Sequence, residues 1–255
     1  MKKIIAFIFT ICLIYVVEAQ KICGKVVYEE ESNIDKYYKT TSLMIFNDTV
    51  SYTKYLKIKE AKLFVRKVYR EDKIDETILS KNKETKYVYT TKKDTYFTDT
   101  TWDKTMTVKE DAFNWNWKIL EETKKIGTFN CQKASIEFRG RKYFAWFTLD
   151  VPVSFGPWKF KELPGLILEI HDSDNLWKMS AKTIDISIKE KCKIPFDTKE
   201  LNNIFSIKEY LKELKRLVNE ELKKFASQLP KGMKIDLDSN CEGCDKPTLE
   251  IFKKE

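Results

Sequence analysis

The chain has 255 residues, of which 42% are hydrophobic, so it can bury a core and is not a disordered or fibrous protein. Its seven Gly and six Pro are too few for long linkers or collagen-like repeats, and its one His, His171, excludes a His-rich metal site and an HExxH helix. The formal net charge of +8 is spread over a chain with interleaved acids and no Gly-rich phosphate loop, so nucleic acids and nucleotides are not expected as partners.

The first 19 residues have the pattern of a secretory signal peptide. Lys2 and Lys3 precede an apolar run over residues 4–17, and Ala19 stands where signal peptidase prefers a small residue. The run is shorter than the roughly 20 residues that cross a membrane, and no later segment is apolar enough to do so. The sequence therefore predicts cleavage after Ala19, a mature chain of residues 20–255 that forms a single β-rich domain, and a location in the periplasm or beyond.

Export makes disulfide bonds the default for the cysteines that remain after cleavage. Cys12 leaves with the signal peptide, and the disulfide candidates are then Cys23, Cys131, Cys192, Cys241 and Cys244. Their odd number means that one thiol stays free or buried, or serves an intermolecular or ligand role. Three roles are open for Cys241 and Cys244: a redox pair, half of a metal site, or a disulfide that closes a small loop. No helix follows them, which disfavours the redox pair. A metal site needs further thiolates to converge, so we expect no metal and no cofactor.

Short alternating runs rich in Tyr, Val, Ile, Phe and Thr predict a mainly β fold. Two hairpins are expected, with arms at residues 42–46 and 50–55 and at residues 87–90 and 95–98, each turned on Asn or Asp residues that tolerate a left-handed backbone. Further strands are expected at residues 62–69, 105–108, 115–120, 131–138, 142–149, 166–170, 178–182 and 184–188. Their spacing predicts a curved antiparallel sheet.

One amphipathic helix is expected near the C-terminus. Ser206 and Glu209 form a capping box, and the pattern ends before Pro230. The apolar residues at helical spacing are Leu211, Leu214, Val218, Leu222, Phe225 and Leu229. Because glutamates lie among the lysines of the opposite face, we expect the helix to pack on the sheet through its apolar stripe and not on a membrane.

The backbone is most constrained between residues 140 and 165, where six of the Gly and Pro residues fall. Gly140 marks the turn of a hairpin with arms at residues 134–138 and 143–147. Pro164 and Gly165 fit a type II turn, in which Gly165 would take a positive φ. Between them, Phe155, Trp158 and Phe160 lie beside lysines.

Residues 154–168 resemble the signature of the GLPGLI family, exported proteins of certain diderm bacteria. The motif residues are Gly156, Pro157, Leu163, Pro164, Gly165, Leu166 and Ile167. The resemblance extends over roughly residues 115–172 and departs at Glu162, where the family motif begins with Gly. It implies a cell-envelope location and no known chemistry. The order of strands and turns in this region is also similar to that of periplasmic half-barrel lipoprotein carriers, which implies that the sheet forms a half-barrel.

Two interpretations of the aromatic segment remain open. It is either a crossover that plugs one end of the core, or the lip of an apolar cavity in which Phe155, Trp158, Phe160 and Trp146 contact an apolar or peptidic ligand. The expected function is therefore that of an exported, non-enzymatic envelope protein that binds a ligand or another envelope protein, without catalytic residues.

The alternative is a metal-binding or hydrolytic envelope protein. Cys131 paired with His171 would give a thiol nucleophile and a base, and the acidic residues near His171 would assist: Glu169, Asp172 and Asp174. The two classes differ in one feature. An enzyme needs a convergent polar cluster around a nucleophile or base, whereas a carrier of apolar ligands needs a concave apolar face without one.

Overall fold

The computed structural model describes residues 22–34, 37–56, 86–101, 104–187, 193–228 and 250. Several predictions fall outside these residues: the signal peptide at residues 1–19, the strand at residues 62–69, and Cys192, Cys241 and Cys244.

The described chain is mostly β-strand, followed by one long helix. The strands are β1 (Cys23–Ser32), β2 (Tyr38–Asn47), β3 (Val50–Tyr55), β4 (Tyr87–Thr91), β5 (Thr95–Thr101), β6 (Lys104–Lys109), β7 (Lys118–Ile126), β8 (Phe129–Phe138), β9 (Arg141–Thr148), β10 (Leu166–Asp172), β11 (Trp177–Ser187) and β12 (Ile204–Phe205). A short 3-10 helix, η1 (Thr198–Glu200), precedes β12, and α2 (Ile207–Ser227) follows it.

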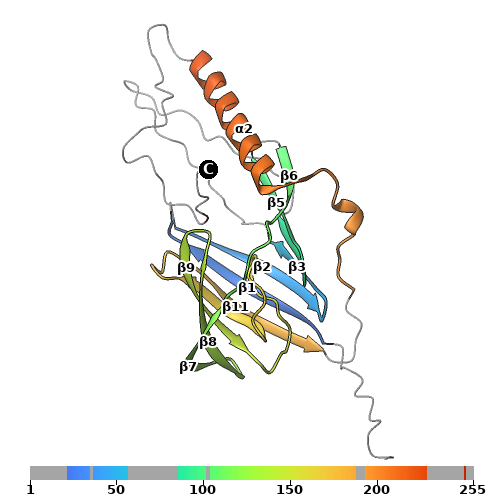
Figure 1. The fold of residues 1–255 in the computed structure, drawn as a ribbon, viewed down its shortest axis with the longest axis vertical. Coiled ribbons are helices and arrows are strands. Elements are labelled where there is room, and N and C mark those ends of the chain that lie inside the picture. The colour runs from blue at the N-terminus through green and yellow to red at the C-terminus, as the bar shows by residue number, and fades with distance from the viewer. Residues whose placement is uncertain are drawn as a thin grey trace, which may run out of the picture.

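All the strands belong to one sheet, in the order β12-β6-β5-β4-β3-β2-β1-β11-β10-β9-β8-β7. Neighbouring strands are antiparallel except for β12, which pairs in parallel with β6. The sheet is curved and open, since its edge strands β7 and β12 do not pair with each other (Figure 1). The predicted fold class, a curved antiparallel sheet with one C-terminal helix, is therefore confirmed.

Strand β1 is the central element that the sequence prediction missed. It pairs with β2 on one side and with β11 on the other. Its buried positions alternate regularly and include Val26 and Tyr28, but the next inward position is Glu30. A charged residue at an inward position breaks the apolar alternation that identifies a half-buried strand. The two strands predicted at residues 178–182 and 184–188 are one continuous strand, β11.

The helix begins as predicted, and its first half packs on the sheet as expected. The Ser206 hydroxyl accepts the Glu209 backbone N–H, and the Glu209 carboxylate accepts the backbone N–H and the hydroxyl of Ser206. Ile207 packs with β4–β6, but Val218 and Leu222 are 39% and 36% exposed. Only the first turns of α2 therefore lie on the sheet, and the helix then projects away from it (Figure 1).

The turns lie at the predicted positions. In the turns at Asn47 and at Pro164–Gly165, however, the expected residue does not take a left-handed backbone. Arg139 and Gly140 have φ values of 48° and 77°, which suit the predicted two-residue hairpin between β8 and β9. Asn47 does not take a left-handed backbone; its side-chain oxygen accepts the N–H groups of Thr49 and Val50.

The expected positive φ at Gly165 is wrong. The left-handed residue in this turn is Glu162, with φ 71°, and its side chain is exposed. Gly165 is needed for another reason: a Cβ there would lie 1.9 Å from the carbonyl oxygen of Thr148. The Gly that begins the family motif would thus occupy the strained position that Glu162 takes in this chain.

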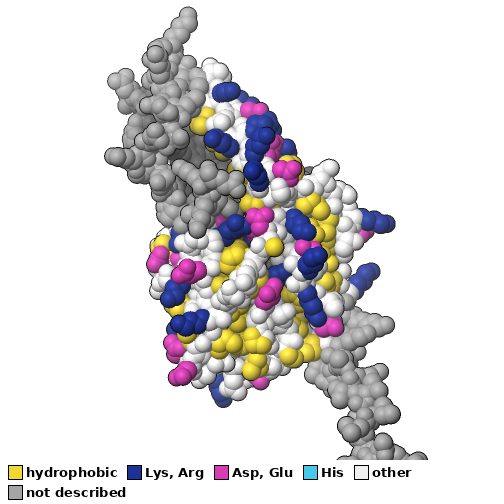
Figure 2. All heavy atoms as spheres, viewed as in Figure 1, with side chains coloured by type: hydrophobic (Ala, Val, Ile, Leu, Met, Phe, Trp, Pro, Cys, Tyr) yellow, Lys and Arg dark blue, Asp and Glu magenta, His cyan; other side chains and the backbone are white. Residues whose placement is uncertain are grey.

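The surface carries mixed charge. Figure 2 shows Lys and Arg side chains interspersed with Asp and Glu on the face drawn, without a continuous basic groove. Within the described residues, no helix is both long and apolar enough to span a membrane.

These positions give opposite predictions for two substitutions in the same turn. Glu162→Gly should raise the free energy of unfolding by about 1 kcal/mol, because Gly adopts the left-handed backbone without the strain of a side chain. Gly165→Ala should lower the free energy of unfolding by about 2 kcal/mol or more, because the new Cβ would overlap the backbone of Thr148. Urea denaturation of both variants tests this, and an equal loss in both would show that the turn is not strained at Glu162.

Candidate functional site

The Gly/Pro-rich segment is a loop that crosses the inner face of the sheet between β9 and β10; we call residues 149–165 the motif loop. Backbone hydrogen bonds close it on itself, from Glu162 N to Ser154 O at 2.9 Å and from Ile167 N to Phe155 O at 3.1 Å. Five of its apolar side chains belong to the main core: Val151, Val153, Phe155, Phe160 and Leu163. The loop is therefore part of the core and is not a surface flap.

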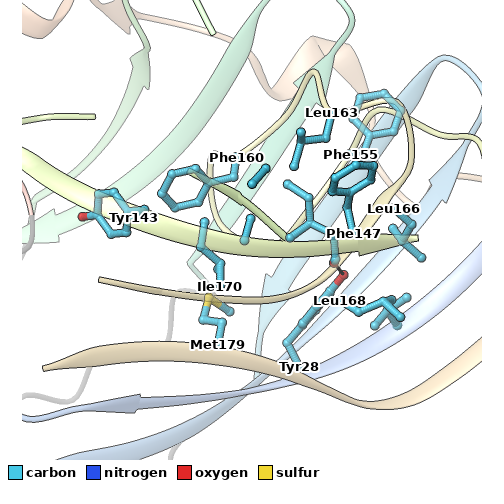
Figure 3. Close-up of a cluster of buried hydrophobic side chains, with 14 of the residues drawn as sticks. Tyr28, Tyr143, Phe147, Phe155, Phe160, Leu163, Leu166, Leu168, Ile170 and Met179 are labelled. Atoms are coloured by element: carbon cyan, nitrogen blue, oxygen red, sulfur yellow. Dashed lines mark hydrogen bonds between the residues drawn. The ribbon is translucent and has the colours of Figure 1, made fainter. Parts of the chain in front are cut away.

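The predicted ligand-binding aromatics lie in different places. Phe155 and Phe160 are each 1% exposed and point into the cluster drawn in Figure 3, where Phe160 packs edge-on against Tyr143. Their burial matches the interpretation as a core plug. A ligand contact by these two residues stays a prediction.

Trp146 lies on β9, away from the other three aromatics. The Lys124 ammonium is 4.3 Å from the centre of its ring, and the Lys133 ammonium is 5.7 Å away. Glu169 on β10 accepts a hydrogen bond from Lys124 at 2.7 Å. Trp146 is thus used in a cation–π and ion-pair arrangement with its strand neighbours.

Trp158 is the only one of the four predicted aromatics that borders both major packed clusters of the described chain. It has a left-handed backbone, with φ 55°, and is partly exposed. Its ring lies 5.9 Å from that of Phe138 and 5.5 Å from that of Trp177, and it also packs against the cluster around Phe97. This places Trp158 where the main core meets the smaller cluster on β4–β6.

The two lysines of the motif loop are buried, which the sequence prediction missed. Lys161 is 5% exposed, and its ammonium donates to the carbonyl oxygens of Thr91, Lys92 and Lys93 at 3.1 to 3.4 Å. Burial lowers the pKa of Lys161. The side chain therefore fixes the loop to the turn between β4 and β5.

Lys159 is buried more deeply and carries the strongest ionic contacts of the loop. It is 1% exposed, and its ammonium lies 3.8 Å from the centre of the Phe97 ring. The ammonium is 2.8 Å from a Glu110 carboxylate oxygen and donates to both carboxylate oxygens of Glu250, at 2.8 and 2.9 Å. Arg139 completes the group through a hydrogen bond to Glu110 and a 3.8 Å approach to Glu250.

These four residues, Lys159, Arg139, Glu110 and Glu250, form what we call the ion cluster. Burial acts to raise the pKa of Glu110, but Lys159 and Arg139 outweigh it and hold that pKa below its usual value. Burial raises the pKa of Glu250, and Lys159 offsets this only in part. Of the two carboxylates, Glu250 is therefore the one held less firmly in its charged form.

Beside the motif loop, the inner face of β1–β3 carries a group of buried polar side chains, which we call the polar stripe. Its members are Glu30, Ser32, Thr40, Ser42 and Thr53, all no more than 9% exposed. The register places Glu30 opposite Thr40. The Ser42 hydroxyl has no hydrogen-bond partner among the described residues.

Glu30 connects the polar stripe to the aromatic residues around it. Its carboxylate accepts the Trp177 indole N–H at 2.8 Å and the Tyr38 hydroxyl at 2.9 Å. Burial raises the pKa of Glu30, because these two hydrogen bonds only partly replace its hydration. Since Trp177 packs against Trp158, the polar stripe and the motif loop form one continuous region.

The residues proposed for hydrolysis have structural roles. Cys131 is a free, buried thiol whose pKa is raised to about 11 by burial, so it is not a thiolate at neutral pH. His171 pairs in register with Phe144, which pairs with Ser135, four residues along β8 from Cys131. That spacing corresponds to roughly 13 Å along the strand.

The acidic residues near His171 are also engaged in structural contacts. Asp172 receives Arg141 at 3.1 Å and the Trp177 backbone N–H at 2.8 Å. Within the described part of the chain, no group of His, Cys, Asp and Glu has the arrangement of a metal site. Cys23 is buried at the start of β1 and is not free, and the disulfide connectivity stays a prediction.

Residues 137–169 match a family of proteins of unknown function, Porph_ging. The matched segment runs from the end of β8 through the motif loop into β10, and so it contains Arg139 and Lys159 but neither carboxylate of the ion cluster. No curated protein matches the chain.

Solved structures resemble the chain only distantly. PNGF-II has 18% identity and a TM-score of 0.47, with 72% of this chain and 31% of the PNGF-II chain covered. An uncharacterised conserved protein from Thermus thermophilus has 8% identity and a TM-score of 0.37, covering 74% and 91%. A LolA superfamily protein from Nitrosomonas europaea has 7% identity and a TM-score of 0.29, covering 71% and 92%. The chain thus spans about a third of the length of PNGF-II, and no function carries over from these proteins.

The ion cluster predicts a specific pattern of destabilisation. Lys159→Met should lower the free energy of unfolding by about 3–5 kcal/mol at pH 7, because two carboxylates would then share one cation in a buried site. The loss should shrink as the pH falls toward 4. Lys159 helps to depress the pKa of Glu110 in the folded protein, so the stability it provides is present above the unfolded pKa and is lost as the carboxylate is protonated.

Lys161→Met is the matched control, because Lys161 is also a buried lysine of the same loop but contacts carbonyl oxygens. Its loss should be smaller, about 1–3 kcal/mol, and should not shrink between pH 7 and pH 4. Denaturant unfolding of both variants at the two pH values measures this. A Lys159→Met loss that does not change with pH would show that the carboxylates are not held by Lys159.

Proposed function

We propose that this protein is an exported cell-envelope protein of the GLPGLI type that binds a peptidic ligand on the inner face of its curved sheet, between the motif loop and strands β1–β3. The N-terminal pattern of residues 1–19 supports export, and the match of residues 137–169 to a family of unknown function is consistent with the motif resemblance. The observation that carries the binding role is the polar stripe.

The polar stripe favours a peptide over a lipid. An alkyl chain laid on the stripe would offer no hydrogen bond to the Ser42 hydroxyl or to the remaining acceptor capacity of Glu30, at a cost of about 1–3 kcal/mol for each unsatisfied group. A peptide backbone has N–H and C=O groups that satisfy a hydroxyl and a carboxylate. The hydroxyl of Ser42 is fully buried and has no hydrogen-bond partner among the described residues, so a peptide that binds it must enter the layer between the motif loop and β1–β3.

Aromatic side chains border the polar stripe and complete the site. Tyr38 is 41% exposed and reaches Glu30, and Trp158 is partly exposed and reaches Trp177. Rings with a polar atom suit a peptide ligand, because they offer apolar area and hydrogen bonds together. Among the aromatics predicted as ligand contacts, Trp158 and Phe160 both pack near Trp177, and Trp158 is the more exposed of the two.

Mass spectrometry of protein purified from its own envelope tests both parts of the proposal. Under denaturing conditions the intact mass should correspond to a chain that begins at Gln20. Under native conditions it should show an additional mass that fragments as a peptide. A chain that retains residues 1–19 would contradict export, and a retained lipid would contradict the peptide-binding role.

Ser42→Ala separates ligand binding from stability. Without ligand, this variant should be as stable as the wild type or up to about 1 kcal/mol more stable, because it removes a buried hydroxyl that lacks a partner among the described residues. Its content of retained peptide should fall several-fold.

Thr95→Val is the matched control, because Thr95 also has a buried hydroxyl without a partner among the described residues but lies at the start of β5, outside the polar stripe. It should share the stability effect and retain the peptide as the wild type does. Equal peptide content in the wild type and both variants would remove Ser42 from the site.

A further inference from the structure

The ion cluster is assembled from segments of two kinds. Arg139 and Lys159 belong to the hairpin turn and the motif loop, and Glu110 directly follows β6, where its backbone N–H donates to Thr95 O at 2.9 Å. Glu250 comes from the far C-terminal part of the chain and is the only described residue beyond residue 228. One carboxylate is thus built into the sheet, and the other is brought to the cluster by a separate segment.

The contacts of Glu250 are those of a bound carboxylate ligand. Both of its oxygens accept hydrogen bonds from the Lys159 ammonium, at 2.8 and 2.9 Å, and one lies 3.8 Å from Arg139 Nε. The walls around Lys159 are the rings of Phe97 and Trp158, at 3.8 and 5.1 Å. Such apolar walls lower the local dielectric and strengthen the attraction between the charges.

Charge balance explains why the position must be filled. Without Glu250, the buried Lys159 ammonium would keep a single carboxylate, that of Glu110, which it shares with Arg139, while Arg139 also lies 3.6 Å from the mostly exposed Asp111. An uncompensated buried charge is strongly unfavourable, and an anion that enters the site would be held there. Glu250 is also the carboxylate whose pKa burial raises, while the pKa of Glu110 is lowered.

We propose that Lys159 and Arg139 form a carboxylate-binding site, that Glu250 occupies it in this structure as an internal ligand, and that the carboxylate of a peptide competes with Glu250 for it. The site itself follows from the ion cluster alone, whereas the identity of the competitor rests on the proposed peptide-binding function. Trp158 links the two, because its ring borders Lys159 on one side and packs on Trp177 beside Glu30 on the other.

Chemical rescue tests the carboxylate site without any peptide. Glu250→Ala should have a lower melting temperature than the wild type, and sodium acetate at tens of millimolar should restore a large part of the loss in a saturable manner. Acetamide and sodium chloride at matched concentration should not do so, and sodium phosphate shows whether any anion suffices. The wild type, whose site is filled, should not respond to acetate beyond the effect of salt.

Two further variants keep this test decisive. Glu250→Gln keeps the shape and removes the charge, so it remains informative if the Ala variant does not fold, and it should respond to acetate less than Glu250→Ala. Glu169→Ala is the matched control, because Glu169 is also a mostly buried carboxylate between two cations, Lys124 and Lys178, but these lysines are 34% and 46% exposed and can be solvated. It should lose stability without an acetate response.

The competition is tested with a short synthetic peptide that has a free C-terminal carboxylate and with its amidated form. The free acid should bind Glu250→Ala at least tenfold more tightly than the wild type, and the amide should not distinguish the two proteins. Absence of an acetate-specific response in Glu250→Ala and Glu250→Gln would overturn the carboxylate site. An acetate response without a preference for the free acid would leave the site in place and overturn the competition with a peptide.

Discussion

A single buried ammonium group, that of Lys159, sets the geometry on which the rest of this structure depends. Removing such a charge from water without a counter-ion costs several kcal/mol, so carboxylates must be brought to it. One of them, Glu110, follows β6, while Lys159 lies between β9 and β10. Seven strands separate β6 from β9 in the sheet order. In a flat sheet that separation would be roughly 38 Å, yet the ammonium and the carboxylate are 2.8 Å apart. The motif loop, which carries Lys159 across the inner face, and the curvature of the sheet together bring these two groups into contact (Figure 1).

The second buried lysine, Lys161, also ties the motif loop to the distant strands of the sheet. Lys161 holds the carbonyl oxygens of the turn between β4 and β5, so the motif loop contacts the far half of the sheet at two points. Between these contacts, Phe155, Phe160 and Leu163 fill the inner face of the near half. The loop thus divides the inner face into a packed apolar part and a part whose base is the polar stripe. The same segment that closes the core leaves the neighbouring part of the inner face polar, and the proposed preference for a peptidic ligand rests on this.

The sequence was informative wherever one local rule decided the structure. Alternation located most strands, Arg139 and Gly140 located a hairpin, and Ser206 with Glu209 located the start of α2. Contacts between residues that lie far apart in the sequence could not be predicted from it. The burial of Lys159 and Lys161 was not predicted, because nothing in their sequence neighbourhood shows that Glu110 and the 91–93 carbonyl groups lie near them. Glu30 broke the alternation of β1 for the same reason, since its partner Trp177 is far away in the sequence. A signal was present in retrospect: two lysines among aromatic residues, in a segment steered by Gly and Pro, indicate buried cations.

The family match clarifies which part of this arrangement is intrinsic to the segment. Residues 137–169 contain both cations of the ion cluster and neither carboxylate. The two cluster cations of this segment cannot be buried without counter-ions, and those counter-ions come from outside the segment. In this chain the anions come by two routes: Glu110 is fixed to the sheet through its backbone, and Glu250 arrives from a distant segment. The contact with Glu110 stabilises the fold permanently, because Glu110 is fixed to the sheet. The contact with Glu250 is the one that we propose to be exchangeable, and on that proposal the charge that shapes the fold also provides a place where a ligand is recognised.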